Sequence, residues 1–352
     1  MTEINVAFNC SNEYVYVTGV AIASILLNSK SNDSFNIVIL HEDIPLYKQK
    51  IVQSLSGIKN CNINFKKIPE GLFNDYKNFN LGYRYSNFRL KLATLLPEFD
   101  KVIFFDSDVL IMSSLEELWN LNLEKYHIAA VQNPDYKFQY NYTINDAQKF
   151  PTKRYNTGVM VVNLSKWRND DSETTIRDAF IWYTSKYSNW PDQQALNIAF
   201  KDSILELDAN YNLGILAYVN NLYDDITVFE NAIRNVKILH YYGAFERPWL
   251  CPSVYGGAEW WAIARKTPFY EALLVYASDK KSLQGVQDIC NLLPYIIKKD
   301  KIIKSYRLFK LLKLIFPIRF VIKKYNDYKF KYKIIKNIKN NINHCHNFKI
   351  MY

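Results

Sequence analysis

Apolar and polar positions alternate with two different spacings over the first hundred residues. Short apolar runs rich in Ile, Val and Phe, bounded by polar residues, predict buried strands at 4–8, 35–40, 62–68 and 101–105. Between them, helical spacing of apolar residues predicts helices over 14–28, 45–55 and 86–96, the last with Ser86 as its N-cap. This alternation is typical of an α/β fold with a mainly parallel sheet and helices on both faces.

The second part of the chain continues the pattern. We expect strands at 127–131, 158–164 and 236–240 and helices over 114–121, 172–187 and 191–200. We expect residues 132–153, which are polar and rich in Tyr and Asn, to form a loop that suits a substrate lid. Pro191 opens its helix and places Asp192 and Gln193 in the first turn, where the helix dipole favours acidic groups.

Charge is distributed unevenly along the chain, whose net charge is +10. From Ile297 onward there are 16 lysines and arginines against two aspartates, a local charge of +14, whereas the first 296 residues carry −4. The pattern becomes helical from about Glu271, and from Lys298 it is dominated by Lys, Ile and aromatic residues. We therefore expect an α/β domain over residues 1–270 and a helical, basic C-terminal region over 271–352.

Composition excludes several classes of protein. Gly is scarce, at 10 residues, and no G-x-G-x-x-G or G-x-x-x-x-G-K occurs, so a nucleotide must be held without a glycine-rich loop. The five cysteines are scattered without C-x-x-C, which fits a reducing cytoplasm. The start lacks the features of a signal peptide, and no apolar run reaches the ~18 residues of a spanning helix. We expect a cytoplasmic protein, peripheral at most on the inner face of the cytoplasmic membrane.

Two aspartates stand at the end of an apolar strand in "VIFFDSDVL" (102–110). Close carboxylates repel each other unless a cation lies between them, and ligands of such sheets bind beyond the carboxyl ends of the strands. Asp106 and Asp108 are therefore candidate metal ligands, and His240, at the end of a late strand, is a third. Two carboxylates and an imidazole suit an octahedral divalent ion and favour Mn²⁺ over Mg²⁺. Taken alone, the Asp pair is as compatible with a solvated turn as with a metal site, and a single histidine at a strand end is more often a packed or capping residue.

Five segments, in this order, resemble glycosyltransferase family 8, the retaining enzymes that transfer a sugar from a UDP-sugar. They run from about Ile4 to Leu250 and are "VAFNCSNEYVYVTGVAIASIL", "SNFRLKLATLLPEFDKVIFFDSDVLIMSSLEELWNLNL", "YNTGVMVVNLSKWR", "DQQALN" and "HYYGAFERPW". The resemblance implies a single Rossmann-like nucleotide-diphospho-sugar transferase domain of the GT-A type. It also implies transfer of a hexose, galactose or glucose, to a bacterial surface glycan such as lipopolysaccharide core, capsule or a glycosylated surface protein.

The resemblance further implies a metal site and a sugar pocket. Asp106 and Asp108 would bind the metal, with His240 as the third ligand, and Asp106 would also touch the donor sugar. Ser107 would be a spacer in the donor site that leaves both carboxylates free to reach one ion. The positions that match the sugar pocket are Arg89, Asn156, Asp192 and Gln193. Of these, Asp192 and Gln193 would stabilise an oxocarbenium-like transition state.

The nucleotide contacts depart from the family's pattern. The loop that matches the uridine pocket contains Phe8, Asn9, Ser11, Asn12 and Tyr14. Many members have an acidic residue where Ser11 or Asn12 stands, so the base contact differs here. Gly243 and Arg247 match positions that hold the diphosphate, where the family usually has Lys and one residue fewer between them. Arg247 keeps the charge and adds a forked donor.

The implied enzyme is a metal-dependent hexosyltransferase that uses Mn²⁺, with Mg²⁺ as the alternative ion. Its partners would be a UDP-hexose donor and a lipid-linked or surface glycan as acceptor. The basic stretch "KIIKSYRLFKLLKLIFPIRFVIKKY" mixes its cations with Ile, Leu and Phe. That mixture favours an anionic membrane surface over nucleic acid as the partner of the C-terminal region.

Two other functions stay open. A haloacid-dehalogenase-like, Mg²⁺-dependent phosphatase also has an apolar strand that ends in D-x-D. In that family the pair normally ends the first strand of the domain, whereas roughly three strand and helix units precede Asp106. A non-catalytic protein that binds a polyanion or a membrane through its basic region is the second alternative.

Overall fold

The computed structural model describes residues 2–77, 84–133, 146, 148–214, 226–243, 247–252 and 254–279. The chain divides into two compact units. The first comprises Met1–Leu213, Ile226–His240 and Lys266–Tyr270, and the second comprises Gly214–Asp225, Tyr241–Arg265 and Glu271–Tyr352. The C-terminal region expected over 271–352 is described only as far as residue 279, and most of the expected lid at 132–153 also lies outside the described residues. The boundary at residue 270 therefore stays a prediction.

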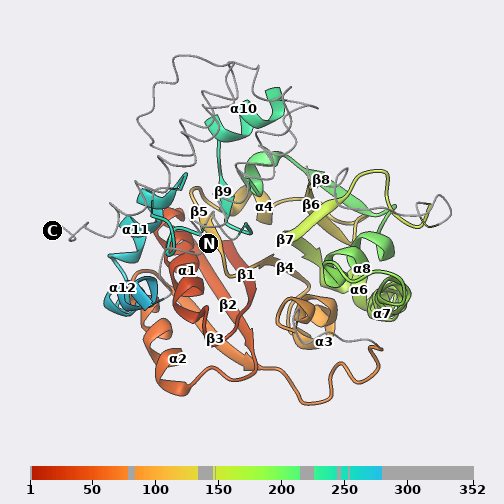
Figure 1. Ribbon diagram of the computed structural model, residues 1–352, viewed down its shortest axis with the longest axis horizontal. Helices are drawn as coiled ribbons and strands as arrows, with labels where there is room; N and C mark the ends of the chain where they lie inside the picture. Colours follow the sequence, from red (N-terminus) through yellow and green to blue (C-terminus); the bar gives the residue numbers. More distant parts are fainter. Residues whose placement is uncertain are drawn as a thin grey trace, which may run out of the picture. The chain divides into compact units, whose positions relative to one another are not determined.

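A seven-stranded sheet forms the centre of the first unit (Figure 1). Its strands are β1 (Thr2–Asn9), β2 (Asp33–His41), β3 (Cys61–Lys67), β4 (Lys101–Phe105), β6 (Ile128–Gln132), β7 (Tyr155–Asn163) and β8 (Ile204–Leu207). Their order is β3-β2-β1-β4-β7-β6-β8, and among these described strands only β7 runs antiparallel to its neighbours. The mainly parallel α/β sheet predicted from the sequence is confirmed, with β8 as an additional strand.

A second, two-stranded sheet joins residues far apart in the sequence. It pairs β5 (Val109–Ile111) with β9 (Ile238–His240) in antiparallel register, so that Val109 lies opposite His240. The chain therefore leaves β4 and enters a new strand after only three residues, Asp106 to Asp108. This arrangement holds the Asp-Ser-Asp turn between two strands.

Helices connect most of these strands. In the first unit they are α1 (Val15–Asn28), α2 (Leu46–Gln53), η1 (Ser54–Gly57), η3 (Ser86–Lys91), α3 (Leu92–Leu95), α4 (Glu116–Trp119), α6 (Leu164–Asn169), α7 (Ser172–Thr184), α8 (Pro191–Ala199), η5 (Ala209–Tyr211) and α10 (Ile226–Arg234). Two further helices, α11 (Gly257–Ala264) and α12 (Tyr270–Asp279), follow. Within the described part of the chain, no helix is both long enough and apolar enough to cross a bilayer.

The helix expected over 86–96 is not one continuous α-helix. It is the 3₁₀ turn η3 followed by the single turn α3, and Ser86 lies inside η3 rather than at an N-cap. The four residues from Asn87 to Leu90 are all buried, so the middle of this turn is enclosed by protein. Tertiary contacts therefore override the helical periodicity that the sequence displays.

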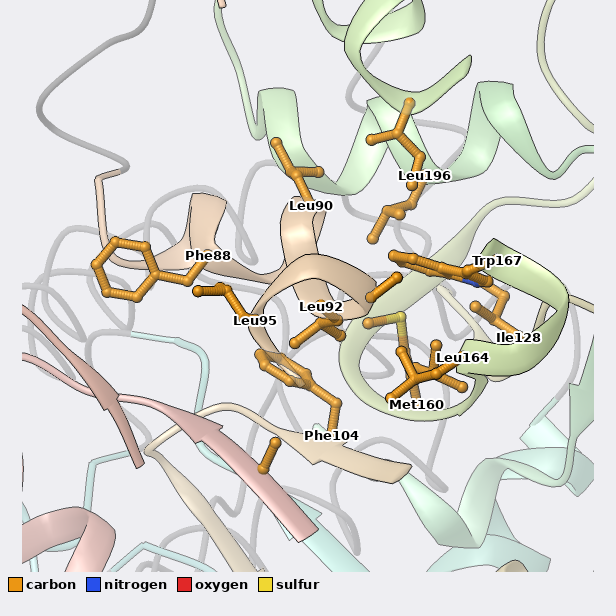
Figure 2. Packing of buried hydrophobic residues seen from close by; sticks show 14 of the residues in the cluster. Phe88, Leu90, Leu92, Leu95, Phe104, Ile128, Met160, Leu164, Trp167 and Leu196 are labelled. Atoms are coloured by element: carbon orange, nitrogen blue, oxygen red, sulfur yellow. The ribbon is translucent and has the colours of Figure 1, made fainter. Parts of the chain in front are cut away.

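One face of the sheet packs against η3, α3, α6 and α8 (Figure 2). Phe104 of β4, Ile128 of β6 and Met160 of β7 pack in one cluster with helical residues that include Leu92, Leu95, Leu164, Trp167 and Leu196. Ile103 and Phe105 alternate with Phe104 and are equally buried, on the opposite face. Because both faces are covered, consecutive residues in the middle of the central strands are apolar, which explains the short continuous apolar runs in the sequence.

Candidate active site

The ends of β4 and β9 bring three candidate metal ligands together. The amide of Asp106 donates to the carbonyl of Gly158 at 2.8 Å, which fixes the chain where it leaves β4. The pairing of β5 with β9 places His240 beside Asp108. The Nε2 atom of His240 lies 3.3 Å from Asp108 Oδ1 and 3.8 Å from Asp106 Oδ2. One ligand atom from each residue lies within 4.8 Å of the others.

These three side chains fit a divalent cation. Neighbouring ligands on an octahedral ion with bonds of about 2.1 Å lie about 3 Å apart, close to the separations found here. Two carboxylate oxygens and one imidazole nitrogen are donors that suit Mn²⁺ and are compatible with Mg²⁺. Gly158 keeps the space around the cluster open, because a Cβ there would overlap His240 Cε1 and would lie 2.5 Å from Asp106 Oδ2.

A buried arginine links this cluster to α8. The guanidinium of Arg89, which is 3% exposed, pairs with Asp106 Oδ1 and lies 3.2 Å from Asp192 Oδ2 through its Nε atom. Its Nη1 atom donates to the carbonyl of Thr157 at 2.7 Å. Arg89 therefore occupies the space between two carboxylates that would otherwise repel each other, and it fixes the position of both.

The charges of the site act on Asp106 in opposite directions. Burial raises the pKa of the Asp106 carboxyl above its usual value, and the carboxylates of Asp108 and Asp192 raise it as well. The nearby Arg89 and His240 lower this pKa, but the net shift is upward. A cation bound between the carboxylates would favour their charged forms, so a proton and a metal ion compete for Asp106.

The helix N-terminus of α8 carries the two residues predicted to act on the reacting sugar. Asp192 is 4% exposed and Gln193 is 9% exposed. Gln193 Oε1 accepts a hydrogen bond from the amide of Thr157 at 3.3 Å, one residue before Gly158. Asp192, Gln193, Arg89 and the candidate metal ligands thus come together around the start of β7, and their roles toward a sugar stay predictions.

Asn156, which also matches the sugar pocket, lies next to the same cluster. Its Oδ1 atom accepts hydrogen bonds from the amide of Gly158 and from Asn212 Nδ2, both at 2.9 Å. Asn212 Oδ1 in turn lies 2.8 Å from Nδ1 of His240. In this structure Asn156 is therefore part of the polar shell behind the candidate metal ligands.

Ser107 ties the Asp-Ser-Asp turn to β1. Its hydroxyl donates to the carbonyl of Asn9 at 2.7 Å and accepts from Thr18 Oγ1 at 2.9 Å. The serine is therefore more than a spacer, because it anchors the turn that carries both aspartates. The side chain of Phe8 is buried beneath this point and packs on Phe105, with ring centroids 5.6 Å apart.

The rest of the predicted uridine loop turns sharply after β1. The amide of Tyr14 donates to the carbonyl of Ser11 at 3.1 Å. Lys48 Nζ donates to Asn12 Oδ1 at 2.7 Å, so a cation lies next to the position where many family members are acidic. The contact of this loop with a base stays a prediction.

Gly243 and Arg247 belong to the second unit of the chain, as does the rest of "HYYGAFERPW" after His240. Residues 244–246 lie outside the described residues. The predicted contact of Gly243 and Arg247 with a diphosphate therefore stays a prediction.

Sequence reasoning missed Thr157, Gly158 and Asn212 as parts of the site. Thr157 and Gly158 stand in "YNTGVMVVNL", where a glycine inside an apolar strand is a recognisable sign of close approach by another group. Asn212 stands in "DANYNLG" without any such local pattern. Its contact with His240 spans 28 residues and exists only in the folded chain.

The mostly parallel seven-stranded sheet, with an Asp-x-Asp turn at the end of β4, is the GT-A fold found in glycosyltransferases. The chain belongs to glycosyl transferase family 8, whose family model matches residues 5–251. The resemblance inferred from the sequence is thereby confirmed. Membership of this family, together with three strands before β4, also argues against the phosphatase alternative.

Several relatives of this chain are glycosyltransferases. Glycosyltransferase GlyF of Streptococcus pneumoniae is 24% identical over 76% of this chain and 62% of that protein. Lipopolysaccharide 1,2-glucosyltransferase of Escherichia coli is 24% identical over 74% of this chain and 77% of that enzyme. The chain spans about three fifths of the length of several relatives, GlyF and GlyB among them.

Solved structures have the same fold. The galactosyltransferase LgtC, in complex with donor and acceptor sugar analogues, has a TM-score of 0.62 and 22% identity over 75% of this chain and 96% of LgtC. The bifunctional glycosyltransferase WbbM has a TM-score of 0.67 and 19% identity over 78% of this chain and 52% of WbbM. These likenesses establish the fold.

Proposed function

We propose that this glycosyltransferase moves a hexose, galactose or glucose, from a UDP-sugar to a glycan of the bacterial surface, with retention of the anomeric configuration. The observation that carries the proposal is the group of Asp106, Asp108 and His240, joined through Arg89 to Asp192. Further support comes from the lipopolysaccharide glucosyltransferase among its relatives and from LgtC, which binds donor and acceptor sugar analogues.

Asp106, Asp108 and His240 would hold a divalent ion, Mn²⁺ or Mg²⁺, that supplies positive charge to stabilise the leaving diphosphate. Arg247 would add a guanidinium to the same diphosphate. Arg89 holds the carboxylate of Asp192 in one position through an ion pair of 3.2 Å. We propose that the fixed carboxylate of Asp192 and the amide of Gln193 stabilise positive charge that develops at the anomeric carbon.

Retention is proposed to arise from attack on the face that the leaving group occupied. In that pathway the departing phosphate oxygen accepts the proton of the acceptor hydroxyl, so no separate protein acid is required. The ion pair with Arg89 also supports this choice, because a carboxylate held by a guanidinium is a poorer nucleophile. A glycosyl adduct trapped on Asp192 and found by mass spectrometry would contradict same-face attack.

The donor can be identified by release of UDP. We expect the full chain, incubated with Mn²⁺, to release UDP from UDP-galactose or UDP-glucose. Without a glycan acceptor, water takes the place of the acceptor hydroxyl and the sugar is hydrolysed slowly from UDP. Chelation by EDTA should abolish release, and Mn²⁺ in excess should restore it. The proposal fails if no UDP-sugar yields UDP above the rate without protein. A generic phosphate ester with Mg²⁺, assayed in parallel, should stay intact.

We propose that the basic C-terminal region attaches the enzyme to an anionic membrane beside a lipid-linked acceptor. Its support is the local charge of +14 from Ile297 onward, interleaved with Ile, Leu and Phe. Each cation close to an anionic surface contributes about 1 kcal/mol of binding free energy. The full chain should sediment with vesicles that contain anionic phospholipid, and a chain that ends at Pro294 should stay in solution. Equal sedimentation of the two chains would contradict the proposal.

A further inference from the structure

A chain of amide hydrogen bonds runs behind the candidate metal ligands. It begins at the backbone of Gly158, passes through Asn156 and Asn212, and ends at His240. Backbone contacts hold its last two members together, because the amide of His240 donates to the carbonyl of Leu213 at 3.0 Å. Asn212 and His240 are 4% and 2% exposed, so little water competes for these hydrogen bonds.

The direction of every hydrogen bond in this series follows from the first donor, the backbone N–H of Gly158. The backbone N–H of Gly158 can only donate, so the atom of Asn156 that it contacts at 2.9 Å is an oxygen. That oxygen also contacts the Asn212 amide at 2.9 Å, which must therefore present its NH₂ group there. The remaining atom of Asn212 is its carbonyl oxygen, 2.8 Å from Nδ1 of His240. In the neutral ring, the proton consequently resides on Nδ1.

We propose that Asn212 is a positioning residue that selects the tautomer of His240 and keeps Nε2 as the unprotonated atom that faces Asp106 and Asp108. The inference rests on the proposed metal site. It concerns a residue behind that site that affects how tightly the site binds a cation. A histidine ligates a metal only through a nitrogen that carries no proton, and the partner of its other nitrogen determines which one that is.

The neighbourhood of His240 would select the opposite tautomer if Asn212 were absent. Asp108 Oδ1 lies 3.3 Å from Nε2, and Asp106 Oδ2 lies 3.8 Å from it. Both carboxylates accept hydrogen bonds, so they favour a proton on Nε2 whenever no acceptor is available for Nδ1. That proton would point at the position of the cation. Asn212 therefore opposes a preference that the metal ligands themselves create.

Nitrogen-15 spectra of the histidine rings test the tautomer directly and without metal. The chain has five histidines, and loss of one set of signals in a His240→Asn variant would assign those of His240. The spectra are recorded at alkaline pH, where the two nitrogens of a neutral ring have distinct shifts. We expect the full chain to show the shifts of a protonated Nδ1 and an unprotonated Nε2 for His240. The opposite pattern in the unmodified protein would overturn the proposal without any variant.

Two substitutions of similar size separate positioning from packing. Asn212→Leu removes the acceptor, and we expect it to move the proton to Nε2 and to weaken Mn²⁺ binding by about 10–100-fold. Asn212→Asp keeps an oxygen that accepts from Nδ1, although it loses the NH₂ group that donates to Asn156. It should therefore retain the original tautomer and lose at most a few-fold in affinity, with a lower melting temperature than the unmodified chain. Free Mn²⁺ measured by electron paramagnetic resonance gives the affinity.

The two readouts distinguish this proposal from the proposed function. An unchanged tautomer in Asn212→Leu would overturn the role of Asn212, whatever the affinity for Mn²⁺. A tautomer that changes in a protein that binds no Mn²⁺ would support the role of Asn212 and would overturn the metal site instead. If Asn212→Leu does not fold, the spectra of the unmodified chain and of Asn212→Asp still decide the question.

Discussion

Replacement of Asp108 by Asn should reduce UDP release by about 10²–10³-fold at saturating Mn²⁺, the loss typical of removing one group that stabilises transition-state charge. The substitution preserves the shape of the side chain but removes its charge. It also replaces one carboxylate oxygen with an NH₂ group, which can face Nε2 of His240. In the unmodified protein, Asp108 Oδ1 lies 3.3 Å from that nitrogen. A donor in that position would occupy the lone pair that the metal requires.

The stability of the Asp108→Asn variant should not fall with its activity. Asp108 and Asp106 repel each other. This repulsion raises the pKa of the Asp106 carboxyl, in addition to the larger effect of its burial. Removal of one charge relieves that repulsion, so the melting temperature without metal should be equal or higher. Addition of Mn²⁺ should raise the melting temperature of the unmodified protein, since a ligand stabilises the state that binds it. The same addition should leave the variant unchanged.

A matched control for Asp108→Asn is Asp178→Asn on α7. Asp178 pairs with Arg177 at 2.9 Å, and its side chain is 65% exposed. The chemical change is identical, but it lies on an exposed helical surface, where ion pairs contribute little. UDP release by Asp178→Asn should stay within twofold of the unmodified rate. Equal activity of Asp108→Asn and Asp178→Asn would refute the metal site.

Strands that are buried on both faces were predictable, because a short run of consecutive apolar residues between polar residues is typical of a buried strand. Residues 6–8 of β1, 37–40 of β2 and 102–105 of β4 are all apolar and buried, so a short apolar run suffices to identify these strands. The pairing of β5 with β9 has no such pattern, since each strand has only three residues and its partner lies some 130 positions away. β8 is only partly buried and is four residues long, so it is too short to show a recognisable alternation of apolar and polar residues.

The site was predictable to the extent that its residues end strands. Asp106 and Asp108 follow an apolar strand of the mainly parallel sheet, in which the carboxyl ends of parallel strands share one edge. His240 ends β9, which pairs with β5 in a separate antiparallel sheet, so its position beside Asp108 depends on that pairing and not on the parallel sheet. Arg89 and Asp192 were expected in a sugar pocket, but their ion pair could not be inferred, because it joins η3 to α8. Contacts of this kind depend on how the helices pack on the sheet, and no local spacing encodes that packing.

Gly158→Ala should reduce UDP release by about 100-fold although every proposed ligand and every charge remains. The added methyl group would overlap His240 Cε1 and would approach Asp106 Oδ2 to 2.5 Å. Neither side chain can retreat easily, since His240 is held by Asn212 and Asp106 by Arg89. At least one ligand must therefore shift, and a displacement of about 1 Å in an active site can lower the rate by about 10²-fold.

The same change at Gly57 provides the control for Gly158→Ala. A Cβ at Gly57 meets no atom within 4 Å, so Gly57→Ala should leave UDP release and Mn²⁺ affinity within twofold. Overpacking at Gly158 should lower the free energy of unfolding by about 1–3 kcal/mol, so activity is compared at a temperature where both variants are folded. Normal Mn²⁺ affinity and normal UDP release by Gly158→Ala would show that the ligands tolerate displacement. Loss of both would show that the geometry around β7, as well as the charges of the ligands, determines the activity of the site.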